Sequence, residues 1–283
     1  MEAAGALHLV GEGVVDELAG DLRGSVARER IVALGGGRVV DTAKALAAAS
    51  GGTQVAMAIP TTLSGAEMTR IHRRARGADQ RAPTVRCRVV VNDPALSASQ
   101  PPNELAASAL NALGHAVEGP CTPLANPVAT LAAHEAAGLL VGAFPAGKKK
   151  PDRDALALGA LLAGYTIDST GYGLHHVLAQ TLVRLAGADH GPANAVLLQH
   201  TIGALAWRFP RQHEALAAAL GADPAEAAAR LCALTGATRL DELGIRADVL
   251  AECADAAAER PELDLTPPRA DRAELLSIYE SAS

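Results

Sequence analysis

The chain has 283 residues, of which 49% are hydrophobic and only 2% aromatic, so its core must consist largely of Ala, Leu and Val, a composition that favours closely packed helices. With a net charge of −6 and a pI near 5.8 it has no basic field for nucleic acid, and no apolar stretch reaches the roughly 20 residues of a membrane span. The N-terminus lacks the blocks of a signal peptide and the four cysteines show neither disulfide nor zinc spacing, so we expect a cytoplasmic protein.

Short apolar runs alternate with helical patterns up to about residue 97, as in the βαβ units of a parallel sheet. The predicted strands are Ala6–Val10, Arg30–Leu34, Gln54–Ile59 and Cys87–Val91. Helices are predicted at Val14–Leu22 and Val39–Ala48, where apolar residues recur at three- and four-residue spacing. We therefore predict an α/β domain over residues 1–97.

From Pro102 onward the sequence shows no strand pattern. The predicted helices include Glu104–Glu118, Pro127–Val141, Ala155–Ser169, Leu174–Leu185 and Pro224–Leu234. Pro127 and Pro224 suit first helical turns, and Asn126 and Asp223 before them are plausible N-caps. An all-helical domain is predicted over residues 98–283.

A strand, a tight turn and a helix surround three consecutive glycines, Gly35, Gly36 and Gly37, which we call the glycine loop. Such a junction presents unpaired backbone N–H groups and a positive helix end, and glycine lets a phosphate approach the backbone closely. The pattern favours a pyrophosphate site. The alternative is that the glycines serve only a tight turn.

A second turn, here called the hydroxyl turn, follows the strand predicted at Gln54–Ile59 and contains Thr61, Thr62 and Ser64. Open α/β sheets bind ligands at the carboxyl ends of their strands. The hydroxyl turn and the glycine loop are therefore predicted to flank one crevice. The alternative is that these hydroxyls only satisfy nearby backbone groups.

Histidines supply the other candidate site. Asn111 and His115 stand four residues apart on one predicted helix and share a face. His176 and His190 follow, fourteen residues apart. Three neutral imidazoles with an open position are able to hold a divalent ion such as zinc or iron. The spacing alone does not establish convergence, and the pair His175 and His176 equally fits one buried and one exposed histidine.

Seven motifs occur in order: GGGRVVDTAK, PTTLSGAE, NDP, LNALGHAVEG, ANPVA, GLHHVLAQ and HGPANA. Together they resemble the iron-containing (group III) alcohol dehydrogenase superfamily, from about Arg30 to the C-terminus. The resemblance implies a dehydroquinate synthase-like fold, with an α/β nucleotide-binding domain and an all-α domain. It also implies that the glycine loop binds the pyrophosphate of NAD(P), that the hydroxyl turn lines the cofactor and substrate cleft, and that iron or zinc binds His115, His176 and His190.

Two positions depart from that family's pattern. Asn111 stands where the family has an aspartate ligand, and Gln180 stands where a further histidine is expected. A neutral amide is a weaker ligand for a hard cation than a carboxylate, so Asn111 is a poor fourth ligand and metal binding should be weak or absent. Asn111 and the paired His175 and His176 resemble the maleylacetate reductase branch, which reduces an unsaturated keto acid with NAD(P)H.

A third departure lies before the glycine loop, where the family has a longer segment. Only 34 residues precede Gly35, and Ala6–Val10 resembles the family's opening strand. We therefore expect a shortened α/β domain that lacks one βαβ unit. In the family, that unit helps to hold the adenosine half of the cofactor. The remaining sheet, bordered by apolar runs such as Ala6–Val10 and Gln54–Ile59, is expected to expose unpaired edges, from which we predict a homodimer.

The leading hypothesis is an NAD(P)-dependent oxidoreductase that reduces a small carbonyl or keto-acid substrate between the two domains. The loops would orient the cofactor, and the histidines or their metal would polarise the carbonyl oxygen. His175 or His176 is expected to donate the proton, because the unperturbed pKa of histidine lies near working pH. Two alternatives are a catalytically silent relative that binds a ligand or partner, and a metal-dependent lyase or cyclase of the dehydroquinate synthase type.

Overall fold

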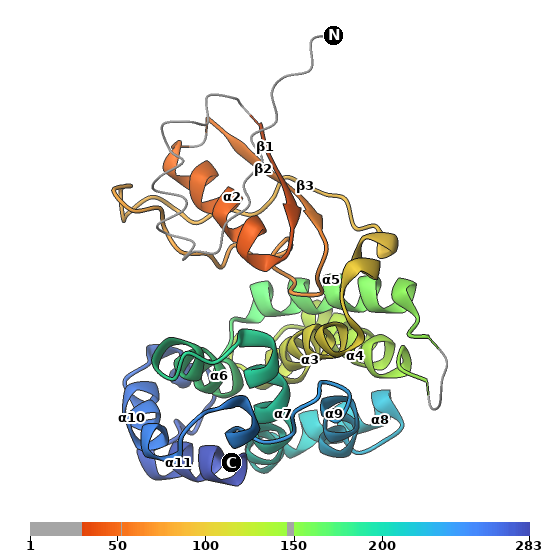
Figure 1. The fold of residues 1–283 in the computed structure, drawn as a ribbon, viewed down its shortest axis with the longest axis vertical. Coiled ribbons are helices and arrows are strands. Elements are labelled where there is room, and N and C mark those ends of the chain that lie inside the picture. The colour runs from red at the N-terminus through yellow and green to blue at the C-terminus, as the bar shows by residue number, and fades with distance from the viewer. Residues whose placement is uncertain (1–29, 52, 146–149) are drawn as a thin grey trace.

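The computed structural model describes residues 30–51, 53–145 and 150–283. Three parallel strands, β1 (Arg30–Gly35), β2 (Val55–Pro60) and β3 (Val89–Val90), form a sheet in that order. β1 pairs with β2 from Arg30 opposite Val55 to Gly35 opposite Pro60, and β3 pairs with β2 at Met57 and Ala58. Helix α2 (Gly37–Ala49) follows β1 and packs on both β1 and β2 (Figure 1).

One face of this sheet packs against α2. Successive strand residues point to opposite faces, and Ala33, Ala56 and Ala58 form a small buried cluster with apolar residues of α2. Val32 and Leu34 point the other way and are 58% and 61% exposed. The small alanine side chains let α2 approach the sheet closely. This packing fixes the junction between β1 and α2, where the glycine loop lies.

The strand pairing corrects one expectation. The sequence predicts a free sheet edge at Gln54–Ile59, which is wrong because β2 is the central strand and pairs on both sides. An apolar run does not distinguish the two cases, since central strands of parallel sheets are apolar on both faces. The predicted strand Ala6–Val10 and helix Val14–Leu22 lie outside the described residues. The homodimer stays a prediction, with β2 no longer available as its edge.

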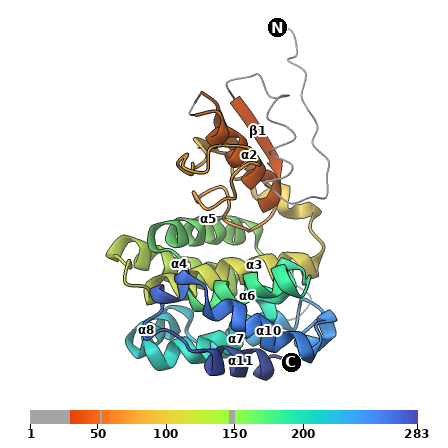
Figure 2. The ribbon, with the colours of Figure 1, turned by 90° about the vertical axis from the view of Figure 1, so that its left-hand side faces the viewer.

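After β3 the described residues form helices. The turn η1 (Pro94–Ser99) precedes α3 (Pro102–Glu118), α4 (Pro127–Gly142), α5 (Arg153–Thr170), α6 (Leu174–Leu185), α7 (His190–Arg208), α8 (Pro210–Leu220), α9 (Pro224–Cys232), α10 (Ala247–Ala258) and α11 (Arg272–Ser281), with short turns η2 (Gly119–Cys121), η3 (Asp241–Leu243) and η4 (Pro261–Leu265) between them. Helix α3 lies in the middle and packs against α4, α5 and α7 (Figure 2). Their buried Ala and Leu side chains form one large core.

Helix ends follow the capping signals closely. The side chains of Asn126 and Asp223 accept hydrogen bonds from backbone N–H groups in the first turns of α4 and α9. Helix α6 has the predicted bounds, whereas α9 ends at Cys232, before the predicted Leu234. His190 is the first residue of α7 rather than the residue before it.

The chain is thus mostly helical with a small parallel sheet. The division into domains at residues 97 and 98 stays a prediction. No helix within the described ranges is long and apolar enough to cross a membrane.

Helix α5 holds the α/β part against the helical part. The side chain of Asp168 is only 3% exposed and pairs with the guanidinium of Arg86. Its Oδ1 also accepts a hydrogen bond of 2.7 Å from the backbone N–H of Arg70. Toward the start of α5, Nδ2 of Asn92 donates to the carbonyl of Ala157 over 2.9 Å. These bonds fasten the segment between β2 and β3, and the residues just after β3, to one helix of the large core.

Candidate active site

The glycine loop lies at the end of the sheet nearest the helical part (Figure 1). Gly35 has a φ of +155°, and a Cβ there would lie 2.8 Å from a methyl carbon of Val39. Gly36 is the N-cap of α2, no side chain among the described residues caps that helix, and its first turn contains no acidic residue. The N-terminus of α2 is therefore available to an anionic group.

The hydroxyl turn packs directly on the glycine loop. The backbone N–H of Thr61 donates to the carbonyl of Gly35 over 3.0 Å. A Cβ placed on Gly36 would lie 3.0 Å from Cγ2 of Thr62, and one placed on Gly37 would lie 2.9 Å from Oγ of Ser64. The two predicted loops thus lie side by side, and glycine is needed because the hydroxyl turn fills the space that side chains would take.

The same turn reaches α3, which carries Asn111 and His115. The backbone N–H of Leu63 donates to Oγ of Ser108 over 2.8 Å, and Nδ2 of Asn111 lies 3.5 Å from the carbonyl of Ser64. A Cβ on Gly65 would be 3.5 Å from Nδ1 of His115. One short segment therefore joins the predicted cofactor loop to the predicted histidine site.

Three of the predicted histidines form a buried cluster between α3 and α6. The rings of His115 and His176 are stacked, with centroids 4.7 Å apart and planes 24° from parallel. His175 meets His176 edge to face, with centroids 4.9 Å apart. His115, His175 and His176 are all buried, which excludes the alternative of one buried and one exposed member of the pair.

Glu118 is a site residue that the sequence analysis missed. Its side chain is fully buried, and Oε2 lies 2.7 Å from Nδ1 of His176. Oε1 accepts a hydrogen bond of 2.8 Å from the backbone N–H of His175. The carboxylate favours the tautomer of His176 with its proton on Nδ1 and a lone pair on Nε2. Spacing offers a signal, since Asn111, His115 and Glu118 recur at four and three residues on one helical face.

The orientation of His175 is set from both sides. Its Nδ1 lies 3.0 Å from Oγ1 of Thr201, whose hydroxyl has backbone carbonyls of α7 as acceptors. A Cβ on Gly114 would be 2.8 Å from Nε2 of His175. Gly114 therefore makes room for the ring. Thr201 on one side and Gly114 on the other keep the ring of His175 buried.

The acid-base state of the pair differs from the expectation. Burial lowers the pKa of both His175 and His176 to about 3, with neighbouring histidines adding to the effect. Burial also lowers the pKa of His115 well below its usual value. The assumption of an unperturbed pKa near working pH is therefore wrong. Burial removes the water that would stabilise the charged imidazolium, so the neutral form is favoured. Near neutral pH all three are neutral.

His190 lies at the start of α7 and is exposed. Its Nε2 is 3.3 Å from Nδ2 of the buried Asn194. Desolvation and then the charge of Arg38, in the first turn of α2, lower the pKa of His190. The start of α7 therefore faces the α2 side of the site.

Several buried polar atoms around the histidines have no hydrogen-bond partner among the described residues. They include Oγ1 of Thr62, Oδ1 of Asn111, Nδ1 of His115, Nε2 of both His175 and His176, and Oδ1 of Asn194. Buried polar groups are nearly always paired. A set of unpaired ones, drawn from the hydroxyl turn, α3, α6 and α7, indicates a place where a ligand completes the hydrogen bonding.

This donor set fits a metal ion poorly. Among the residues that the structure describes, no group of three or more His, Cys, Asp or Glu side chains is arranged to hold one. Asn111 brings an amide where a carboxylate would bind more strongly. No catalytic step is therefore assigned to a metal.

Glu67, directly after the hydroxyl turn, is a buried carboxyl that the sequence analysis also missed. It is 2% exposed, and its Oε2 has no partner among the described residues. Burial raises the pKa of Glu67 from 4.5 to about 7. The carboxyl thus titrates in the neutral range rather than in acid.

We expect this carboxyl to make stability depend on pH. Between the two pKa values the folded chain keeps a proton that the unfolded chain has lost, so the free energy of unfolding should fall as pH rises, by up to about 3 kcal/mol. Glu67→Gln should remove this fall, whereas Glu135→Gln, at an exposed position, should not. Urea unfolding at about pH 5 and about pH 8 measures the difference. Equal pH dependence in wild type and Glu67→Gln would contradict the assignment.

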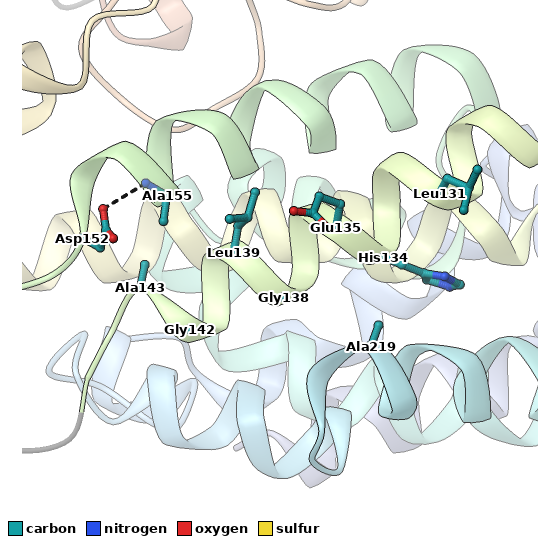
Figure 3. Close-up of a pocket in the computed structure, with 10 residues that line it drawn as sticks. All are labelled: Leu131, His134, Glu135, Gly138, Leu139, Gly142, Ala143, Asp152, Ala155 and Ala219. Carbon is teal, nitrogen blue, oxygen red and sulfur yellow. Dashed lines mark hydrogen bonds between the residues drawn. The ribbon is translucent and has the colours of Figure 1, made fainter.

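A separate hollow of about 460 Å³ lies between α4, the start of α5 and the end of α8 (Figure 3). It is lined by Leu131, His134, Glu135, Gly138, Leu139, Gly142, Ala143, Asp152, Ala155 and Ala219. Asp152 there is occupied in capping α5, as it accepts from the backbone N–H of Ala155. None of the predicted site residues lines this hollow, so it is not part of the candidate active site.

Residues 105–283 match the model of the Fe-containing alcohol dehydrogenase family, C-terminal. The chain is 35% identical over 265 residues to maleylacetate reductase 1 of Rhodococcus opacus, covering 90% of this chain and 73% of the relative. It is 37% identical over 238 residues to maleylacetate reductase 2 of Cupriavidus pinatubonensis, covering 81% of this chain and 66% of that relative.

Solved structures show the same likeness. The crystal structure of maleylacetate reductase from Agrobacterium tumefaciens superposes with a TM-score of 0.82 at 28% identity, covering 93% of this chain and 76% of that one. Sulfoacetaldehyde reductase from Bifidobacterium kashiwanohense, in complex with NAD+, superposes with a TM-score of 0.79 at 23% identity, covering 95% and 79%. The second likeness concerns the fold alone.

Proposed function

Because this chain belongs to the Fe-containing alcohol dehydrogenase family, we propose that it is an NAD(P)-dependent oxidoreductase that reduces the carbonyl group of a small keto acid. Its relatives of 35% and 37% identity are named maleylacetate reductases. The observation that carries the proposal is the set of unpaired buried atoms on Thr62, Asn111, His115 and His176, next to an uncapped helix N-terminus. A substrate oxygen and a dinucleotide phosphate are the groups that would complete them.

The glycine loop and the hydroxyl turn fit the dinucleotide. Gly36 and Gly37 place no side chain over the start of α2, and Thr62 and Ser64 pack against them. Backbone N–H groups at this helix end would hold the pyrophosphate, and the positive end of α2 would favour its charge. The bound nicotinamide supplies hydride chemistry. The protein's part is to fix the ring's position relative to the histidines.

The histidine cluster is proposed to bind and orient the carbonyl group. Oγ1 of Thr62 and Nδ1 of His115 have no hydrogen-bond partner among the described residues, and both can hydrogen-bond a substrate oxygen. Glu118 fixes the ring of His176, so its Nε2 is held toward the same unpaired set. Because these rings are buried and neutral, they act by position and hydrogen bonding. The proton for the product hydroxyl then enters from solvent, through a water molecule that donates one hydrogen to the lone pair on Nε2 of His176 and the other to the substrate oxygen.

Direct binding and turnover measurements test the function. Purified protein should quench the fluorescence of NADH or NADPH on titration, and should oxidise the preferred one when maleylacetate is added. A neutral aldehyde of similar length serves as the comparison substrate. Binding of neither dinucleotide would overturn the proposal and favour a silent relative that binds another ligand.

We expect weak metal occupancy in the purified protein, and Asn111→Asp should raise it. Asn111 lies one helical turn before His115, and its Oδ1 is buried and unpartnered. The aspartate would add an anionic donor to neutral imidazoles. Metal content per chain after dialysis, by mass spectrometry, measures both forms. Near-stoichiometric iron or zinc in the wild type would show that the amide suffices, and zero in both would show that a carboxylate is not the missing element.

A further inference from the structure

Lys44 of α2 is a fully buried lysine that the proposed function does not use. Its Nζ lies 2.7 Å from the carbonyl oxygen of Ala66, 3.0 Å from that of Thr69 and 3.0 Å from that of Ile71. Oγ1 of Thr69 is 3.3 Å away, and Oδ1 of Asp41 forms an ion pair at 2.8 Å. One ammonium thus faces five oxygen atoms.

Three of these oxygens are backbone carbonyls from a single six-residue stretch, 66–71. An ammonium has three N–H donors and no acceptor, so this surrounding satisfies it completely. A charge without such partners is rarely buried. The stretch 66–71 surrounds the ammonium with carbonyl oxygens, as cation-binding loops surround a metal ion, but here the cation is a side chain of the protein.

The stretch held in this way continues the hydroxyl turn. On one side it follows Gly65, which approaches His115 and the backbone of Gly164. On the other side the backbone N–H of Arg70 is bound by Asp168 of α5. Lys44 is therefore a second link from α2 to this segment, in addition to the packing of Thr62 and Ser64 on the glycine loop.

We propose that Lys44 is a positioning residue, whose ammonium shapes the segment 61–71 so that the hydroxyl turn meets the glycine loop and the histidine cluster together. This rests on the proposed function for its effect on dinucleotide binding. A second consequence does not depend on the proposed function. Removal of the side chain leaves three carbonyls and the Asp41 carboxylate around a space suited to a small ammonium ion.

Chemical rescue tests the proposal. In Lys44→Ala, NAD(P)H affinity should fall roughly ten-fold or more, and amide hydrogen exchange over 61–71 should become faster. Ammonium or methylammonium chloride should restore both, whereas tetramethylammonium chloride at equal ionic strength should not, because it has no N–H to donate. Lys150→Ala, at an exposed lysine, is the matched control and should respond to none of these salts.

Lys44→Gln provides a second variant, in case the alanine form does not fold. Its amide fills the space and is neutral, so affinity should again fall and the amines should give no rescue. Wild-type affinity and exchange in either variant, or equal response to ammonium and tetramethylammonium, would overturn the proposal. If wild-type protein binds no dinucleotide, the proposed function fails, and the exchange measurement still decides the role of Lys44.

Discussion

Gly36→Val is expected to lower NAD(P)H affinity by about 100-fold, equivalent to about 3 kcal/mol. A Cβ at this position would already lie 3.0 Å from Cγ2 of Thr62, so the valine must push the hydroxyl turn away. It would also cover the backbone at the start of α2, where a phosphate needs to approach. Titration of nicotinamide fluorescence measures the affinity, and circular dichroism shows whether the helices persist.

Gly203→Val is the matched control for this change. Gly203 lies on an exposed position of α7, with nothing within 4 Å of an added Cβ. The control should bind the dinucleotide as the wild type does. Equal affinity in wild type and in folded Gly36→Val would remove the glycine loop from the cofactor site.

Glu118→Gln is expected to reduce kcat by about 100-fold or more while the chain stays folded. The carboxylate accepts from the backbone N–H of His175 and from Nδ1 of His176. A glutamine can keep the first bond through its carbonyl, but its NH₂ group then meets Nδ1 as a donor. His176 would have to move its proton to Nε2, and the lone pair in the site would be lost.

The readouts separate this effect from simple loss of stability. Dinucleotide affinity should change little, because the partners of Glu118 are His175 and His176 of α6 and not residues of the glycine loop, and the thermal transition should remain cooperative. Glu135→Gln, on the exposed side of α4, makes the same chemical change without touching a histidine. If kcat in Glu118→Gln matched that of this control, the tautomer of His176 would have no part in the reaction.

Local signals predicted much of the helical part. The helix 174–185 has its predicted bounds, and Asn126 and Asp223 cap α4 and α9 as expected. These features depend on residues close in sequence, so periodicity and capping rules suffice. β3 is shorter than predicted, with only Val89 and Val90 in the ladder. Strand length depends on the partner strand, which a local pattern does not contain.

The sequence predicted the main segments of the candidate site, but not the buried charged residues around them or the protonation state of the histidines. The glycine loop, the hydroxyl turn and His115 and His176 were found from motifs. Glu118 and Lys44 were not, because the groups that reveal their roles are far away in sequence. The histidines bound by Glu118 are 57 or more residues away, and the carbonyls around Lys44 are 22 or more residues away. The carbonyl oxygens around Lys44 have no side-chain signature at all. The neutral state of the histidines likewise follows from burial, which only the packed structure shows.

The fastening of the α/β part to α5 affects how the molecule melts. The described residues of the α/β part form two small buried clusters, whereas those of the helical part share one large core. Bonds to Asp168 and Ala157 of α5 connect the chain around β3 to the helical part. A unit with so little apolar contact opens at low free energy unless a neighbour supports it. The sheet therefore draws its thermal resistance from α5, and loss of these bonds should split one calorimetric transition into two.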